Sequence, residues 1–270
     1  MKKNTQDTTN LFRVERRHTI LAQLRREGKV FVNELSTSFN VSGATIRQDL
    51  AIMETQGLLT RTHGGAVEKT KTSIDIPLDE RNTKRLPQKT AIAMKALEFV
   101  SDGDSLILDG GTTILEFTKI LELSNRANVN VVLNFIPHIT VLEKSNHIRM
   151  IVLGGSYDES LRSLVGLITV DSLSTLYADT AFISTTGISM EQGITCTSLM
   201  DAEVRKTILN RAKKKILLAD SGKIGKNSFI SVADLKQVDI LITDWEIAES
   251  DYNMLVEFGL KVIVAPKLAP

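Results

Sequence analysis

The strongest constraint on the fold is a series of short apolar segments that alternates with helical patterns from Gln88 onward. Short apolar runs of this kind are typical of strands buried on both faces. The predicted strands are Ser105–Leu108, Val129–Leu133, Met150–Leu153, Ala181–Ser184, Lys215–Ala219, Ile240–Thr243 and Lys261–Ala265. Helices are predicted between several of them, at Ile114–Glu122, Val170–Tyr177, Asp201–Lys213 and Ile247–Phe258. The sequence therefore predicts an α/β domain over residues 88–265 with a largely parallel sheet covered on both faces.

Residues 30–67 follow a different pattern, in which short helices lead into a hairpin. Ser42 is a good N-cap residue, and Ile46, Leu50 and Met53 recur after it at helical spacing. The opposite face of this predicted helix carries Gly43, Ala44, Thr45, Arg47 and Gln48. Short residues at a helix N-terminus allow close approach to the major groove, where Arg or Gln can reach base edges. We therefore expect this helix to read DNA.

The segments around this helix complete a small domain. A helix is predicted over residues 14–27, with Ile20, Leu21 and Leu24 on one face, and Asn33 is expected to cap a second helix over residues 34–39. Residues 58–67 are expected to form two short strands around paired glycines. The whole is a winged helix-turn-helix domain of residues 13–68, with Arg61 and His63 as candidate contacts in the wing. An ordinary surface histidine explains His63 equally well.

Charge is distributed unevenly along the chain. Residues 1–70 hold 11 Lys/Arg and 7 Asp/Glu, a balance of +4, and the remainder holds 33 − 11 = 22 basic and 32 − 7 = 25 acidic residues, a balance of −3. This asymmetry favours a basic N-terminal module on a mildly acidic body, although ordinary surface charge is the alternative. Residues 1–12 are expected to be a disordered tail. Residues 69–87, which contain two prolines and no periodicity, are expected to be a linker.

Several classes of protein are excluded by composition. The single cysteine, Cys196, excludes an intramolecular disulfide and a multi-cysteine metal site, and the four histidines show no ligand spacing. No apolar run approaches the roughly 20 residues of a membrane span, and the first ten residues lack the apolar region of a secretory signal. We expect a cytoplasmic protein without metal, cofactor or membrane partner.

The loop after the first predicted strand is a candidate anion site. In an open parallel sheet, ligands bind beyond the carboxyl ends of the strands. There the chain reads Asp109-Gly110-Gly111-Thr112-Thr113 and enters a helix. Two glycines bring the backbone close to a ligand, and two hydroxyls and the helix N-terminus supply donors. A phosphate is the expected ligand, with a tight turn and N-cap as the alternative.

Loops after the other strands are expected to converge on the same cleft. They contain Asn134, Gly154–Ser156, Thr185–Gly187, Gly193–Thr195 and Asp220–Lys226. The last loop superficially resembles a P-loop but lacks the G-x-x-x-x-G-K-[ST] spacing, so nucleotide hydrolysis is rejected. Lys223 in this loop can still meet a phosphate or sugar oxygen.

The N-terminal pattern resembles the DeoR family of bacterial transcription regulators. The shared residues are Arg16, Ile20, Leu24, Ser42, Thr45, Ile46, Arg47, Asp49, Leu50, Gly64 and Gly65. The resemblance implies that Thr45, Arg47 and Gln48 face DNA. Asp49 is instead expected to steady the fold by pairing with an arginine, because a carboxylate repels phosphate. The predicted DNA-binding set is Ser42, Gly43, Thr45, Arg47, Gln48, Arg61, His63 and Gly64.

The C-terminal region resembles the sensor domain of the same family, which is related to ribose-5-phosphate isomerase. The resemblance implies a phosphorylated sugar as effector. The implied effector-binding residues are Asp109, Gly110, Gly111, Thr112, Thr113, Asn134, Gly187, Glu203 and Lys223. Two departures from the family pattern, Leu133 in place of a Thr and Gly222 in place of a Ser, each remove a hydroxyl. The effector can therefore differ from the commonest ones of the family.

An active sugar-phosphate isomerase on the same scaffold is the alternative function. Such chemistry needs a carboxylate base and a polarising lysine, which Asp109, Glu203, Asp220 and Lys223 could supply. The fused DNA-reading domain favours sensing over turnover, so we expect no enzymatic activity and no catalytic residues. The resemblance implies a repressor of a carbohydrate-catabolism operon, bound to double-stranded operator DNA as a homo-oligomer, a dimer or a tetramer.

Overall fold

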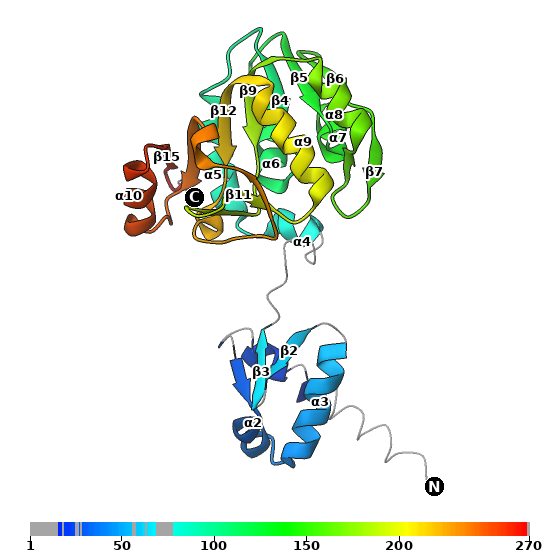
Figure 1. Cartoon of the computed structure of the whole chain (residues 1–270), viewed down its shortest axis with the longest axis vertical. Coiled ribbons are helices and arrows are strands. Elements are labelled where there is room, and N and C mark those ends of the chain that lie inside the picture. The colour runs from blue at the N-terminus through cyan, green and yellow to red at the C-terminus, as the bar shows by residue number, and fades with distance from the viewer. Residues whose placement is uncertain are drawn as a thin grey trace. The chain divides into compact units, whose positions relative to one another are not determined.

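The computed structural model describes residues 16–17, 19–24, 27, 29–55, 58–62, 64–68 and 78–268. The chain divides into two compact units, residues 1–71 and 72–270, and each has its own apolar core (Figure 1). None of the described helices is both long and apolar enough to cross a membrane.

The N-terminal unit is a winged helix-turn-helix, as predicted. Its elements are α2 (Val32–Ser38), α3 (Gly43–Thr55), β1 (Lys29–Phe31), β2 (Leu59–Thr62) and β3 (Gly65–Glu68). Residues 16–17, 19–24 and 27 are also helical. The three strands form one antiparallel sheet with β3 in the middle. The buried side chains of the predicted helix faces, Ile20, Leu24, Ile46, Leu50 and Met53, share one cluster beneath it.

The start of α2 differs from the sequence prediction. Phe31 occupies the N-cap position with an extended backbone, and the helix begins at Val32. Asn33 lies inside the first turn, where its carbonyl accepts hydrogen bonds from the hydroxyls of Ser36 and Thr37. The prediction that Asn33 caps this helix is therefore wrong. The burial of Val32 in the core explains the earlier start.

Asp49 on α3 holds two arginines of the first helical segment. Its carboxylate lies 2.7 Å from Arg16 Nη2 and 2.8 Å from Arg17 Nε, and the side chain is only 3% exposed. A buried carboxylate is tolerated when opposite charges and hydrogen bonds compensate its lost hydration. The predicted pairing of Asp49 with an arginine is confirmed, and it fixes the orientation of the first helix against α3.

The C-terminal unit is built on a seven-stranded sheet in which every neighbouring pair is parallel. In spatial order its strands are β15 (Lys261–Ala265), β14 (Ile240–Asp244), β12 (Ala212–Leu218), β9 (Ala178–Ile183), β4 (Ser105–Leu108), β5 (Val129–Leu133) and β6 (Ile148–Val152). All seven predicted strands belong to this sheet. The predicted α/β class is confirmed.

Helices cover both faces of the sheet (Figure 1). The helices of this unit are α4 (Leu78–Thr83), α5 (Leu86–Leu97), α6 (Thr112–Glu122), α7 (Ile136–Leu142), α8 (Leu167–Ser174), α9 (Leu199–Asn210) and α10 (Glu249–Glu257). Residues of α5, α6 and α7 share one apolar cluster with the sheet, and residues of α8, α9 and α10 share another. Along β4, Leu106 and Leu108 join the first cluster and Ile107 joins the second, as alternation along a strand requires.

Packing fixes α6 against the centre of the sheet. The Phe117 ring of α6 lies 4.3 Å, centroid to centroid, from the Phe182 ring of β9, and both side chains are fully buried. Burying one such side chain contributes about 1.5–3 kcal/mol. Because α6 begins at the loop after β4, this contact also positions that loop.

Two small sheets lie outside the main one. β10 (Gly187–Ser189), β11 (Gly193–Cys196) and β13 (Ile230–Ala233) form an antiparallel sheet, and β7 (Ser156–Asp158) pairs with β8 (Ser163–Val165). The 3-10 turns η1 (Ser221–Lys223) and η2 (Leu235–Gln237) follow β12 and β13. These segments contain most of the loops that were expected to converge on a ligand.

The predicted linker over residues 69–87 is wrong in its second half. Leu78–Thr83 forms α4, and α5 begins at Leu86, two residues before the predicted start of the C-terminal domain. Leu78 is buried against Leu115 and Phe135, so α4 belongs to the core of the C-terminal unit. A six-residue helix between two prolines has too few apolar positions to show helical periodicity.

Candidate functional site

The N-terminus of α3 presents an exposed polar face. The backbone N–H of Thr45 donates to Ser42 Oγ at 3.2 Å, which satisfies one free donor of the first turn, so the predicted cap is present. Ala44, Arg47 and Gln48 are exposed, whereas Ile46 and Leu50 are buried. The helix is therefore held by its apolar face and leaves its polar face free.

In the wing, Arg61 is exposed and its guanidinium lies 3.9 Å from the Glu54 carboxylate of α3. Gly64 is exposed in the turn. A Cβ on Gly65 would lie 1.9 Å from the Val30 carbonyl oxygen, so glycine is needed there for the pairing of β1 with β3. The prediction for His63 lies outside the described residues.

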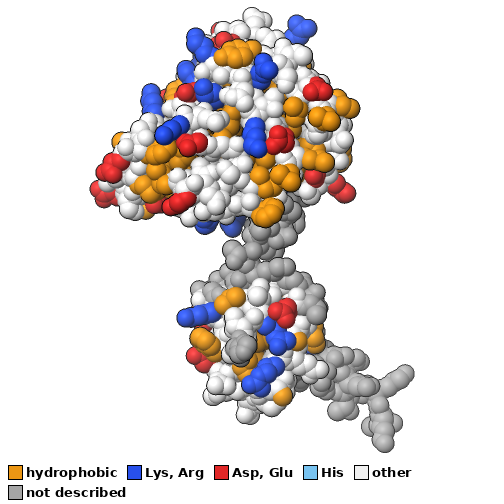
Figure 2. Space-filling model, viewed as in Figure 1, with side chains coloured by type: hydrophobic (Ala, Val, Ile, Leu, Met, Phe, Trp, Pro, Cys, Tyr) orange, Lys and Arg blue, Asp and Glu red, His pale blue; other side chains and the backbone are white. Residues whose placement is uncertain are grey.

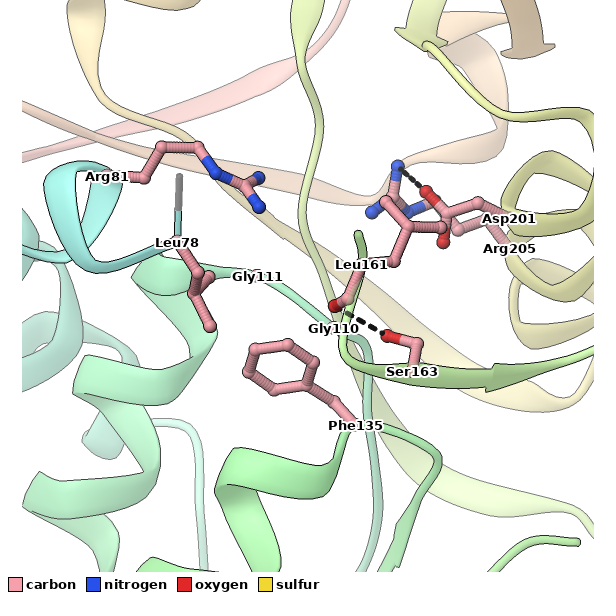
Figure 3. Close-up of a pocket in the computed structure, with 9 residues that line it drawn as sticks. All are labelled: Leu78, Arg81, Gly110, Gly111, Phe135, Leu161, Ser163, Asp201 and Arg205. Atoms are coloured by element: carbon pink, nitrogen blue, oxygen red, sulfur yellow. Dashed lines mark hydrogen bonds and ion pairs between the residues drawn. The ribbon is translucent and has the colours of Figure 1, made fainter. Parts of the chain in front are cut away.

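A pocket lies in the C-terminal unit at the loop that follows β4 (Figure 3). It contains about 270 Å³ of empty space, part of it open to solvent. The lining residues are Leu78, Arg81, Gly110, Gly111, Phe135, Leu161, Ser163, Asp201 and Arg205. The pocket therefore lies beyond the carboxyl end of a central strand, as expected for an open parallel sheet.

A buried ion-pair triad forms one wall of the pocket. Arg205 Nε lies 2.8 Å from Asp109 Oδ2, and Arg205 Nη1 lies 2.9 Å from Asp201 Oδ2. Burial disfavours the charge of Arg205, but the two carboxylates outweigh it and raise the pKa of the guanidinium above its ordinary value. Burial raises the pKa of Asp201 to about 6, against the opposing charge of Arg205. The two ion pairs thus hold Asp109, Asp201 and Arg205 in fixed positions relative to one another.

The loop between β4 and α6 brings its backbone to the pocket. Gly111 has φ 137°, and a Cβ there would lie 2.7 Å from Ser184 Oγ. A Cβ on Gly110 would lie 3.0 Å from Ser163 Oγ. Gly111 therefore excludes a larger residue, and a side chain at Gly110 would crowd Ser163. The two glycines let the chain pass close to the pocket at the start of α6, where unpaired N–H groups favour an anion.

His138 supports this loop from below. The side chain is fully buried, its Nε2 donates to the Asp109 carbonyl at 3.0 Å, and its Nδ1 lies 2.9 Å from Thr118 Oγ1. Burial lowers the pKa of His138 to about 4, although its hydrogen bond to Asp109 opposes this shift. The imidazole is therefore neutral near pH 7, and its two hydrogen bonds hold the loop after β4 in place.

Two of the predicted effector residues, Gly110 and Gly111, line the pocket, whereas Asp109 is buried and reaches it only through its ion pair with Arg205. Thr112 is half-buried at the start of α6, and Thr113 is fully buried with a hydroxyl that has no hydrogen-bond partner among the described residues. Asn134 is buried and donates its side-chain amide to the Leu164 carbonyl. This hydrogen bond ties the end of β5 to β8.

Two predicted residues lie away from the pocket lining. A Cβ on Gly187 would lie 2.4 Å from the Lys226 carbonyl oxygen, so this glycine serves the packing of β10. Lys223 is half-buried in η1, and burial lowers its pKa with further contributions from the charges of Arg205 and Arg81. The Lys223 side chain does not line the pocket, but its charge interacts with those of Arg205 and Arg81, which do.

The assignment of Glu203 to the pocket is wrong. Its side chain is 60% exposed and lies 2.9 Å from Lys206 Nζ on the surface of α9. The residues of this helix that line the pocket are Asp201 and Arg205. Neighbouring residues on an α-helix are separated by about 100°, so a residue two positions from Asp201 lies on the opposite face.

Sequence reasoning also missed Arg81 and the apolar lining of Leu78, Phe135 and Leu161. The four-residue spacing between Asp201 and Arg205 was a usable signal, since it places both charges on one helix face. No comparable signal marks Arg81, because its six-residue helix is too short to show apolar periodicity. Cys196 is buried in the core, and burial raises the pKa of its thiol. No group of metal-ligating side chains occurs within the described part of the chain.

Each of the two units matches a known protein-family domain. Residues 16–72 match the DeoR-like helix-turn-helix domain, and residues 84–245 match the DeoR C terminal sensor domain. The chain belongs to the DeoR family. α3 thus belongs to a DeoR-like helix-turn-helix domain, and most of the pocket lining lies in the DeoR C terminal sensor domain.

Relatives of the DeoR-family chain are similar over most of its length. The HTH-type transcriptional regulator GolR of Listeria innocua is 30% identical over 94% of this chain and 100% of its own length. The HTH-type transcriptional repressor GlcR of Bacillus subtilis is 32% identical, covering 94% and 97%. The lactose phosphotransferase system repressor of Staphylococcus epidermidis is 32% identical, covering 85% and 91%. These relatives are transcriptional regulators.

Proposed function

We propose that this DeoR-family regulator represses a carbohydrate-catabolism operon and is released from operator DNA by a phosphorylated sugar. Support for repression of such an operon comes from the names of its relatives, which include the lactose phosphotransferase system repressor and a putative aga operon transcriptional repressor. On this proposal, Ser42, Gly43, Thr45, Arg47, Gln48, Arg61 and Gly64 form the DNA-contacting surface. The recognition helix enters the major groove and the wing lies along the backbone.

The observation that carries the effector proposal is the combination of charges and backbone at the pocket. Two guanidinium groups, those of Arg81 and Arg205, line it together with the glycines that open α6. Guanidinium groups and helix N-terminal N–H groups are the donors that phosphate prefers in proteins. Acceptors for sugar hydroxyls lie close by on Asp201 and Ser163, and the buried Asp109 carboxylate is paired with Arg205. Apolar surface comes from Phe135 and Leu161.

The same geometry argues against isomerase chemistry. A catalytic base must be able to reach a substrate proton. Asp109 and Asp201 are both paired with Arg205, and Asp220 is paired with Arg85 at 3.0 Å. Glu203 points to solvent. Lys223 does not line the pocket. The four groups that could have supplied a base and a polarising lysine, namely Asp109, Glu203, Asp220 and Lys223, therefore do not converge there, and we propose sensing without turnover.

A thermal-shift screen over hexose and pentose phosphates tests the effector proposal. A compound present at 100 times its dissociation constant is expected to stabilise the C-terminal unit by about 2.7 kcal/mol, and the same compound is expected to release operator DNA in a gel-shift titration. The unphosphorylated sugar serves as the matched control. If phosphorylated and unphosphorylated forms of every sugar behave alike, the phosphate assignment fails.

We further propose that the protein acts as a homo-oligomer, since one helix-turn-helix covers only one half-site. β6 is an edge strand of the main sheet, and Ile151, Val152 and nearby Ile168 are exposed there. Figure 2 shows exposed apolar side chains over the visible face of the C-terminal unit. Light scattering is expected to give at least twice the mass of the 29.8 kDa chain. A monomer at the concentrations that bind DNA would contradict this.

A further inference from the structure

We propose that α4 is the element that senses the bound effector, and that Arg81 on α4 binds the anionic group of the effector. This inference rests on the proposed function, because it assigns a further binding residue and a route of control to the same pocket. It goes beyond that function by placing control in the first helix of the C-terminal unit, a segment that the sequence had marked as linker.

Arg81 enters the pocket from the side opposite the ion-pair triad. Figure 3 shows its guanidinium extending from α4 toward the space that Asp201 and Arg205 border from the other side. Arg205 is held by two carboxylates, whereas Arg81 Nε is buried without a hydrogen-bond partner among the described residues. No dashed line in Figure 3 reaches Arg81 from the other residues drawn. A buried donor of this kind gains most from a ligand that supplies an acceptor.

Several positive charges lie near Arg81, with the Asp201 carboxylate opposing them. Burial and the Arg205 charge lower the pKa of Arg81. Lys89 is buried, its Nζ donates to the Arg81 carbonyl, and burial together with the Lys223 charge lowers the pKa of Lys89 to about 8. Like charges that depress one another are relieved by an anion placed among them. A phosphate between Arg81 and the start of α6 meets this requirement.

The attachment of α4 makes it suitable for transmitting such binding. A helix of six residues has little stability of its own and depends on tertiary contacts. Leu78 packs against Leu115 and Phe135 at one end, and the Lys89 hydrogen bond holds the Arg81 carbonyl. Ligand contacts to Arg81 would therefore add substantially to the few interactions that hold α4 in place.

The chain is fixed on one side of α4 and continues toward the DNA-binding domain on the other. Arg85, two residues after α4, forms ion pairs with Asp220 at 3.0 Å and Asp244 at 3.2 Å. Residues 69–77 connect the N-terminal side of α4 to β3 of the wing. Because Arg85 is anchored, a change in how firmly α4 is docked is passed to the segment that leads to the DNA-binding domain. A ligand shifts such an equilibrium by the difference in its affinity for the two states.

The test compares wild type with Arg81→Ala, Arg81→Lys and Lys84→Ala in the full-length chain. The probes are inorganic phosphate and the most stabilising sugar phosphate of the panel, with binding measured by calorimetry. Arg81→Ala is expected to bind both probes at least about tenfold more weakly, since a charge-assisted hydrogen bond is lost. Arg81→Lys keeps the charge and is expected to bind with intermediate affinity. Lys84 is exposed and outside the pocket lining, so Lys84→Ala is expected to match wild type.

Hydrogen exchange of the amides of residues 78–84 reports the coupling. In wild type, saturating sugar phosphate is expected to slow exchange in α4 at least about tenfold. In Arg81→Ala, at a concentration that saturates the variant, this protection is expected to be lost together with most of the release of operator DNA.

Three results would overturn the proposal. If Arg81→Ala binds and responds like wild type, α4 is not the sensing element, and the proposed function stands. If wild type binds the sugar phosphate without added protection of α4, the coupling is wrong and only the pocket remains. If no panel compound stabilises wild type, the proposed function fails and this inference fails with it.

Discussion

Replacing Arg47 by alanine is expected to weaken operator binding by roughly 5- to 150-fold for each DNA-binding domain that makes the contact. This corresponds to about 1–3 kcal/mol if the guanidinium reads a base edge. Arg47 is exposed, whereas Ile46 and Leu50 of the same helix are buried, so its loss leaves the core of the winged helix-turn-helix intact. The measurement is a gel-shift titration on a DNA site selected from random sequence by the wild-type protein.

Lys144→Ala is the matched control for Arg47→Ala. Lys144 is an exposed cation of the C-terminal unit, and its removal changes the net charge by the same amount. We expect this control to bind the selected DNA like wild type. An Arg47→Ala protein with unchanged affinity would mean that another surface of the N-terminal unit contacts the DNA.

Replacing Arg205 by methionine is expected to destabilise the C-terminal unit by about 3–5 kcal/mol. The reason is that Asp109 and Asp201 would keep their burial and lose their shared counter-charge, which is the costly way to break a buried ion pair. Urea unfolding of the variant and wild type measures the difference. Lys206→Met is the control one residue along α9. Its ion pair with Glu203 is largely exposed, so a change below about 1 kcal/mol is expected.

The Arg205→Met effect should depend on pH with a definite sign. A carboxyl whose pKa is raised in the folded protein binds a proton there at pH values where the unfolded chain has lost it. In wild type the pKa of Asp201 is about 6 because of burial, so its contribution to stability falls as pH rises from about 4 to 6. Without the Arg205 charge, which opposes this shift, the Asp201 carboxyl is expected to hold its proton to higher pH. The deficit of the variant should therefore be smaller at pH 5 than at pH 8, and an equal deficit at both would contradict the electrostatic account. Partial rescue of stability by adding Asp109→Asn and Asp201→Asn is expected.

The main sheet was predictable because its strands are apolar on both faces. Runs such as Leu106–Leu108 and Val131–Leu133 have few alternatives to burial in the middle of a parallel sheet. The recognition helix was predictable for a related reason, since Ser42 and the apolar spacing after it specify both its start and its buried face.

The parts that escaped prediction depend on tertiary contacts. α4 has one deeply buried apolar residue, Leu78, and its partners Leu115 and Phe135 lie far along the chain. Glu203 was assigned from the family pattern, but the helix phase brings Asp201 and Arg205 to the pocket. A sequence motif does not show which of two residues two positions apart faces the pocket. On a helix these two residues point to opposite faces, so one lines the pocket and the other is exposed to solvent.

The ion pairs of Asp49 with Arg16 and Arg17 affect how strongly operator binding depends on salt concentration. Proteins that neutralise DNA phosphates release the cations condensed on the DNA, and each neutralised phosphate contributes about 0.9 to the slope of log affinity against log salt. Arg16 and Arg17 are two of the 11 basic residues within residues 1–70, and the single carboxylate of Asp49 compensates one of their two charges inside the domain. At most 11 − 1 = 10 positive charges of this region can then displace counterions. The salt sensitivity of operator binding is set by this smaller number, and base-edge contacts, which release no counterions, account for correspondingly more of the affinity.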